Sequence, residues 1–193
     1  MKIRSRLALF AAGAAILGGG ALAVSTAASK PVTPPDLSSE LAAFRDVCVS
    51  PASHGEIRRK ARATGWEAMA PNDAPPLLAG IGASDIQEIR LGEIAGRPAM
   101  LMVSDLAGTS ECRIYFQPAD PAATIAQLKA EPVLGAPLGE PDFDDMMNYP
   151  KGWKAIGWHR SAAKDWRAVH YSFDPDGQGP NAGWQAIEIT RKI

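Results

Sequence analysis

Cysteine and histidine are the residue types most able to do chemistry in this sequence, and they are few. The chain has two cysteines, Cys48 and Cys112, and three histidines, His54, His159 and His170. A zinc site needs cysteine or histidine ligands at characteristic spacings, which these five residues do not show. A redox centre normally pairs its cysteines as C-x-x-C, and these two lie far apart. The role of the thiols therefore depends on the compartment in which the chain resides.

A second group with chemical potential comes from the last third of the chain. Alternating apolar residues there predict three antiparallel strands, in a register that places His170 opposite Glu188, with His159 on the diagonal. Cross-strand partners lie about 5 Å apart and diagonal neighbours about 7 Å apart, so the three residues form a cluster. The same face is expected to carry three tryptophans around small residues: Trp153, Trp166 and Trp184.

This cluster has a functional interpretation and a plainer one. Small residues flanked by indoles predict a shallow groove, in which the indoles stack on a flat or sugar-like ligand and the His/Glu group supplies hydrogen bonds. The same group would allow hydrolase-like acid–base chemistry. Alternatively, the small residues let a helix pack closely, and His170 and Glu188 are an ordinary cross-strand pair. We assign no catalytic residue and predict no metal site or cofactor, since the sequence has no P-loop, dinucleotide fingerprint or G-x-S-x-G motif.

The compartment is indicated by the first 27 residues, which have the layout of a secretory signal peptide. Lys2, Arg4 and Arg6 precede an uncharged apolar run, which three glycines interrupt before small residues that suit a cleavage site. An uncleaved anchor is the alternative, because residues 7–24 carry no charge. The glycines and small residues favour cleavage. We expect a periplasmic or secreted protein, with membrane contact only if the leader remains attached.

Export also gives the two cysteines a role. In an oxidising compartment paired thiols become disulfides, and Cys48–Cys112 is the only intramolecular pair that two cysteines allow. A bridge closing a loop of about 65 residues stabilises the fold by roughly 4 kcal/mol in the chain-entropy treatment. We therefore predict a structural disulfide.

The elements that position these residues begin after a short lead-in. Residues 28–36 are small, polar and rich in proline, which predicts a flexible segment. Residues 37–193 are expected to form a single domain. Apolar residues at helical spacing predict a first helix from about Asp36 to Val49, with Cys48 on its buried side. Ser53 and Glu56 form a capping box that predicts the start of a second helix.

The pattern then changes to the period of two that is typical of strands. Strands are predicted at 86–94, 97–106 and 111–118, with Cys112 facing the core. Pro121 begins a third helix, and the three C-terminal strands described above complete the chain. The sequence thus predicts an α+β domain in which an antiparallel sheet of about six strands packs with two N-terminal helices and one mid-chain helix.

Charge excludes one class of partner. Without the leader the chain has 17 basic and 21 acidic residues, a net charge of −4. This mild acidity argues against nucleic-acid binding, which relies on a basic surface. The one basic cluster, at residues 58–62, is interpreted as a solvated helix face. Asp142, Asp144 and Asp145 are interpreted as a solvated loop. The calcium-loop-like segment 174–179 is interpreted as a hairpin, because it lacks the required glutamate.

One resemblance adds to this reading. The motif F-x-x-x-C at Phe44 to Cys48, the helix end at Gly65-Trp66 and the strand cysteine Cys112 resemble a type of small exported protein of unknown function from Gram-negative bacteria. The resemblance implies a periplasmic or envelope location and a disulfide. It implies no catalytic residue.

Three functions follow as expectations. The first is a non-enzymatic binding or interaction module for an unknown envelope ligand or protein. The second is a hydrolase-like enzyme that uses His159, His170 and Glu188. The third is an envelope structural protein held by an uncleaved N-terminal segment.

Overall fold

The computed structural model describes residues 36–78, 84–106, 108–118, 120–147, 150, 152–162, 165–178 and 181–192. The chain divides into two units, Met1–Val32 and Thr33–Ile193, and all described residues belong to the second. The predicted signal peptide and most of the predicted lead-in lie outside the described residues. Within these residues no helix is long and apolar enough to cross a membrane.

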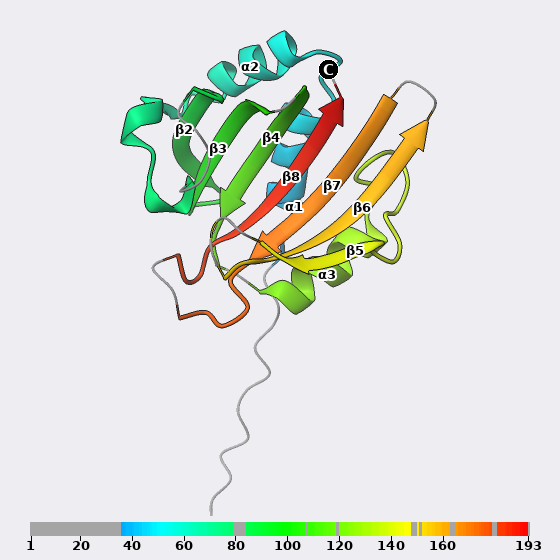
Figure 1. The fold of residues 1–193 in the computed structure, drawn as a ribbon. Helices are drawn as coiled ribbons and strands as arrows, with labels where there is room; N and C mark the ends of the chain where they lie inside the picture. Colours follow the sequence, from blue (N-terminus) through cyan, green and yellow to red (C-terminus); the bar gives the residue numbers. More distant parts are fainter. Residues whose placement is uncertain are drawn as a thin grey trace, which may run out of the picture. The chain divides into compact units, whose positions relative to one another are not determined.

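The described residues form one antiparallel sheet of eight strands (Figure 1). Its order is β1-β2-β3-β4-β8-β7-β6-β5. The strands are β1 (Glu67–Met69), β2 (Ile86–Ile94), β3 (Arg97–Leu106), β4 (Thr109–Phe116), β5 (Phe143–Met146), β6 (Lys154–Ala162), β7 (Asp165–Phe173) and β8 (Gln185–Lys192). The sheet therefore consists of two four-stranded meanders, which meet where β4 pairs with β8.

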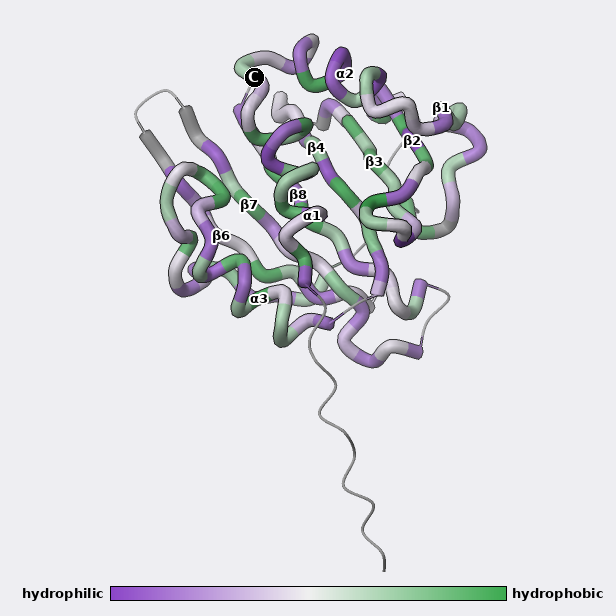
Figure 2. Tube along the Cα trace, turned by 180° about the vertical axis from the view of Figure 1, so that it is seen from behind, coloured by the Kyte–Doolittle hydropathy of each residue, from purple (hydrophilic) through white to green (hydrophobic). Residues whose placement is uncertain are grey.

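The helices lie on one face of this sheet, as views from its two sides show (Figures 1 and 2). They are α1 (Ser38–Phe44), continued by the π-helical turn η1 (Arg45–Val49), α2 (His54–Ala63) and α3 (Pro121–Ala130). Buried side chains from each helix join inward residues of β2, β3, β4 and β6–β8 in the main core. Each half of the domain is thus helical structure followed by four strands.

The α+β class is confirmed, and the strand count is corrected from about six to eight. The two additional strands, β1 and β5, are the edges of the sheet. Both are short and lack the alternation of apolar and polar residues that predicts a strand, because neither has a fully buried face. The helical pattern on residues 37–48 is confirmed, although the chain changes from α-helix to a π-helical turn at Arg45.

The reverse face of the sheet carries a smaller core on its β2–β3 side. The 3-10 turns η2 (Pro71–Asp73) and η3 (Pro76–Leu78) lie in the connection before β2, and Leu77 and Leu78 pack there with Met100 and Met102 of β3. This segment covers that part of the face. Among the described residues, no helix covers the reverse face over β6 and β7.

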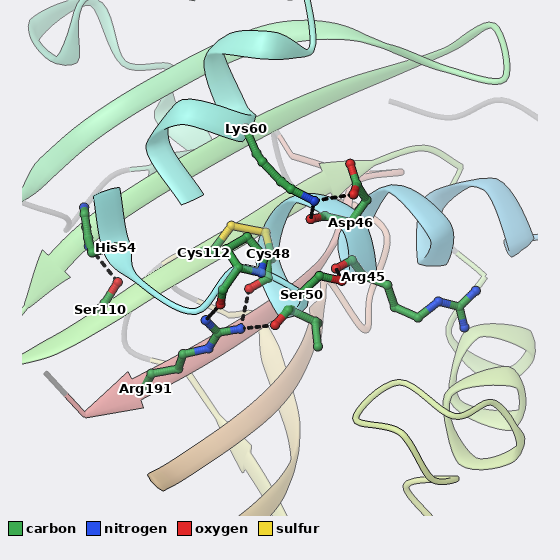
Figure 3. Close-up of a disulfide and its surroundings, with 11 residues drawn as sticks. Arg45, Asp46, Cys48, Ser50, His54, Lys60, Ser110, Cys112 and Arg191 are labelled. Atoms are coloured by element: carbon green, nitrogen blue, oxygen red, sulfur yellow. Dashed lines mark hydrogen bonds and ion pairs between the residues drawn. A yellow bond between two sulfur atoms is a disulfide. The ribbon is translucent and has the colours of Figure 1, made fainter. Parts of the chain in front are cut away.

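The predicted disulfide is present between Cys48 and Cys112, whose Cα atoms are 5.4 Å apart (Figure 3). Both cysteines are buried, and the bond joins η1 to β4. Beside it, the guanidinium of Arg191 on β8 donates hydrogen bonds of 2.5–2.7 Å to the carbonyl oxygens of Cys48, Val49 and Pro51. Because the last carbonyls of a helical turn lack partners within it, Arg191 acts as their cap.

Candidate functional site

The pairing of β7 with β8 places His170 directly opposite Glu188, as the apolar alternation predicts. On the other side, β6 places Gly157 opposite His170. The Nδ1 atom of His170 lies 3.4 Å from Glu188 Oε1. Since a carboxylate can only accept, this contact suits an imidazole with its proton on Nδ1.

His159 completes the predicted cluster. Its ring centroid lies 5.6 Å from that of His170, and the two rings are close to perpendicular. The partner of His159 is Asp142, whose Oδ1 atom is 2.5 Å from Nδ1. Asp142 also accepts a hydrogen bond from the backbone N–H of His159, which holds the pKa of the carboxyl below its ordinary value. Asp142 is thus a partner of His159, a role that its interpretation as part of a solvated loop did not include.

The small residues of this face make room for neighbouring side chains of the sheet. A Cβ atom on Gly157 would lie 2.6 Å from His170 Cδ2, so the imidazole occupies the space above that glycine. Ala186 packs in the smaller core with Tyr115 and Trp153. At Gly157 and Ala186 the neighbouring groups are therefore these side chains, and not the closely packed helix considered above.

A buried polar network extends from the histidines toward β4. Glu188 forms an ion pair with Arg113, and its Oε1 atom accepts a 2.7 Å hydrogen bond from Thr190. Arg113 also donates a 2.9 Å hydrogen bond to the Tyr115 hydroxyl, and burial raises the pKa of that tyrosine. The charge of Glu188 is thus compensated inside the protein. Glu188 is only 6% exposed, so its carboxylate has little access to an external ligand.

Burial lowers the pKa of His170 to about 4, and the neighbouring His159 and Arg113 act in the same direction. The nearby Asp142 acts in the opposite direction, but its effect is smaller. His170 is therefore neutral at neutral pH. Its contact with Glu188 is then a hydrogen bond between a neutral ring and a carboxylate, rather than an ion pair.

The tryptophans of the predicted groove are Trp153, Trp166 and Trp184, and those whose side chains are described are buried or partly buried. Trp153 is 2% exposed, which leaves little indole surface for stacking on a ligand. Trp184 is partly buried against the same smaller core. Trp166 pairs with Ser161 through the backbone of β7 and β6, and its side chain lies outside the described residues.

The exposed side of the cluster comes from β5, which the sequence did not predict. The Phe143 ring lies 6.2 Å from the His159 ring and 6.1 Å from the His170 ring, measured between centroids. Phe143 is 38% exposed, and Met146 on the same strand is 55% exposed. These two are the exposed large hydrophobic residues of the described chain. We call β5 together with Asp142 and His159 the β5 surface.

A second polar group contains serine, histidine and aspartate. His54 Nδ1 lies 2.7 Å from Ser110 Oγ and 2.8 Å from Asp105 Oδ1. A catalytic triad requires the serine and the aspartate on different ring nitrogens. Here both lie on Nδ1, and the buried Nε2 atom has no partner among the described residues. This arrangement joins α2 to the β3–β4 hairpin and lacks the geometry of a nucleophilic site.

The described residues contain no group of three or more His, Cys, Asp or Glu placed to hold a metal ion. In the calcium-loop-like segment, Asp174 Oδ1 accepts hydrogen bonds of 3.0 and 3.1 Å from the backbone N–H groups of Asp176 and Gly177. This carboxylate thus stabilises a turn between two strands. The interpretation of the segment as a hairpin loop agrees with this contact.

No known protein family, curated protein or solved structure matches this chain. The resemblance to small exported proteins is therefore not supported by a family match. The resemblance implies a disulfide, and the structure contains one between Cys48 and Cys112.

Proposed function

We propose that this chain is an exported, non-enzymatic binding module that recognises an extended segment of an envelope protein at the β5 surface. One observation carries the proposal: both exposed large hydrophobic residues of the described chain, Phe143 and Met146, lie on a single four-residue edge strand. Isolated apolar residues are common on protein surfaces, whereas two on one short edge strand would give an added strand an apolar contact on each face of the sheet.

The position of β5 in the sheet favours an extended partner. Among the described strands β5 pairs only with β6, so its outer side can accept another strand. The outward N–H of Met146 now donates to Asp145 Oδ1 at 2.7 Å, and a partner carbonyl would replace this contact. Phe143 lies opposite Gly157 and Met146 lies opposite Lys154, which place the two side chains on different faces of the sheet. An added strand would therefore contact an apolar side chain on each face.

The charge of the β5 surface favours a basic partner. Asp142, Asp144 and Asp145 are all exposed, and Asp144 pairs with Lys154 at 2.9 Å. A second copy of this chain would bring the same carboxylates together, which is unfavourable. A segment that alternates basic and apolar residues would instead place its cations near these carboxylates. The rings of His159 and Phe143 offer it further contact area.

The disulfide supports the proposed export, because such bonds persist mainly in oxidising compartments. Binding is favoured over catalysis by the partners of the histidines. The carboxylate partner of His170, Glu188, is 6% exposed and already paired with Arg113, which leaves it little access to a substrate.

The test is an NMR titration of the isotope-labelled full chain with a synthetic peptide that alternates lysine and valine. The amides of residues 142–147 should shift, and a peptide that alternates glutamate and valine should cause no such shift. The Phe143→Ser/Met146→Ser double variant should lose the response, since it removes exposed apolar groups without opening the core. Ala68→Ser, on the opposite edge strand β1, is the matched control. Equal responses to both peptides, or none to either, would refute the proposal.

A hydrolase-like enzyme is the second candidate, and one observation favours it. Both His159 and His170 turn Nδ1 toward a carboxylate, as the histidine of a general acid–base pair does. Turnover of chromogenic ester or phosphodiester substrates that His159→Gln abolishes would support this candidate. An anchored structural protein is the third, and an intact Met1 in the mass of the exported protein would favour it.

A further inference from the structure

The outward side of α2 carries a hollow that the proposed function does not use. Four residues line it: Gly55, Arg58, Arg59 and Arg62. Their spacing of three, four and seven residues places them on one stripe of the helix. The buried residues Ile57 and Ala61 lie on the other side. The hollow is open and has a volume of about 310 Å³.

The three arginines differ in how far their charges are compensated. Arg62 Nε lies 3.0 Å from Glu88 Oε2, but Glu88 also pairs with Arg90 at 2.8 Å. Arg59 makes only a 3.5 Å contact with Glu56. The carboxylates of Glu56 and Glu88 are thus the ion-pair partners of three arginines on this side of the protein.

Arg58 is the least compensated of the three. Its Nε atom is shielded from solvent and has no hydrogen-bond partner among the described residues. None of the described carboxylates forms an ion pair with it. A guanidinium with a solvent-shielded donor loses hydration without gaining a partner, which is unfavourable.

Lys60 shows that a basic residue of α2 can be compensated within the fold. Its Nζ atom turns away from the hollow and lies 2.5 Å from Asp46 Oδ1 and 3.0 Å from the Asp46 carbonyl oxygen. Figure 3 shows this contact beside the disulfide. The basic cluster at 58–62 therefore separates into one structural lysine and three arginines whose side chains line the hollow.

We propose that this hollow binds a phosphate group. Guanidinium groups bind phosphate oxygens through paired hydrogen bonds, and arginine suits this geometry better than lysine. Gly55 adds no side chain at the first turn of the helix, where a Cβ atom would meet nothing within 4 Å. The volume is at the lower end of small-molecule sites, which suits a phosphate with a small attached group. Such a group can come from an anionic lipid or from a free phosphorylated molecule.

The experiment uses the full chain, purified without reductant, and two probes. One is inorganic phosphate, followed by the NMR signals of the arginine Nε–H groups. The other is vesicles that contain phosphatidylglycerol, compared with pure phosphatidylcholine vesicles in a sedimentation assay. Binding of both probes would indicate that the phosphate group suffices. Binding of the anionic vesicles alone would indicate a lipid source.

Arg58→Gln/Arg59→Gln should weaken binding of the responding probe by at least about tenfold, since it removes charge-assisted hydrogen bonds. Lys60→Gln is the matched control. It removes a positive charge from the same helix, outside the hollow, and should change the affinity by less than about threefold, an effect of screened net charge alone. The proposal is overturned if neither probe binds, if the double variant binds as well as the wild type, or if Lys60→Gln is equally damaging.

Discussion

The imidazole of His170 occupies the space above Gly157, where a Cβ atom would lie 2.6 Å from His170 Cδ2 and 3.3 Å from Phe143 Cβ. Gly157→Ala should therefore turn the His170 ring outward. Because the ring is partly exposed and can move, the fold should be destabilised by no more than about 2 kcal/mol. The more exposed His170 should have a higher pKa than in the wild type. An NMR titration of its carbon-bound ring protons measures this change.

Gly55→Ala is the control for that experiment, since a Cβ atom at Gly55 meets nothing within 4 Å. It should leave the His170 signals unchanged. A Gly157→Ala variant with the same His170 pKa and ring contacts as the wild type would contradict the packing described here.

The lowered pKa of His170 makes stability depend on pH. Between its pKa of about 4 in the folded state and the ordinary value of 6.5, the unfolded chain binds a proton that the folded chain does not. This contribution is present above pH 6.5 and is lost as the pH falls toward 4. It amounts to at most about 3 kcal/mol. Urea unfolding at several pH values should show this loss, and His170→Gln should lack it. Equal slopes for the two proteins would refute the prediction.

Glu40 should give the stability a pH dependence of the opposite sign. Its side chain is buried and forms an ion pair with Arg97, yet burial outweighs the attraction of Arg97 and raises the pKa of this carboxyl. The folded chain therefore holds a proton that the unfolded chain releases. Stability from this group is present below pH 4.5 and decreases as the pH rises through the folded-state pKa. In the same urea measurements, Glu40→Gln should remove this decrease, and an unchanged pH profile would show the prediction to be wrong.

The strand register of the C-terminal half could be predicted from the sequence because one face is buried. Val169 and Tyr171 must face the core together with Ile187 and Ile189, so a shift by one residue would expose all of them. This constraint alone brings His170 opposite Glu188. The helical face of Cys48 and the strand face of Cys112 could be predicted for the same reason, and both agree with the disulfide that export and the single available pair predict.

Residues whose roles depend on pairing between distant segments could not be predicted. Arg113 alternates with the inward-facing Cys112 and Ile114, but its ion pair with Glu188 requires the pairing of β4 with β8. Asp142 contacts His159 because the chain leading into β5 runs beside β6. The strand β5 has both faces exposed, so hydrophobic periodicity cannot reveal it. Hydrophobic periodicity arises from burial, so it cannot predict an edge strand that is exposed on both faces.

Arg191 should be important for stability, although it belongs to neither proposed binding surface. Its guanidinium donates to three carbonyl oxygens at the end of η1 and beyond it. Arg191→Ala should reduce the free energy of unfolding by about 2–4 kcal/mol, because these hydrogen bonds involve a charged donor and partly buried acceptors. The neighbouring, exposed Lys192 provides the control, since Lys192→Ala should have little effect in the same urea unfolding experiment. Equal stabilities of the two variants would contradict the capping role.

The disulfide should account for a large share of the stability. It links residues separated by 64 positions, so reduction frees a long loop in the unfolded chain. Cys48→Ser/Cys112→Ser should lower the free energy of unfolding by about 4 kcal/mol in the chain-entropy treatment, which is comparable with the net stability of many domains. Both sulfur atoms are buried against the main core, so the reduced protein should also expose apolar surface and bind a hydrophobic dye.

Urea unfolding with and without reductant measures the contribution of the disulfide to the free energy of unfolding. A thiol assay on the denatured native protein should detect no free thiol. Two free thiols in protein isolated from its native compartment would contradict both the bond and the proposed export.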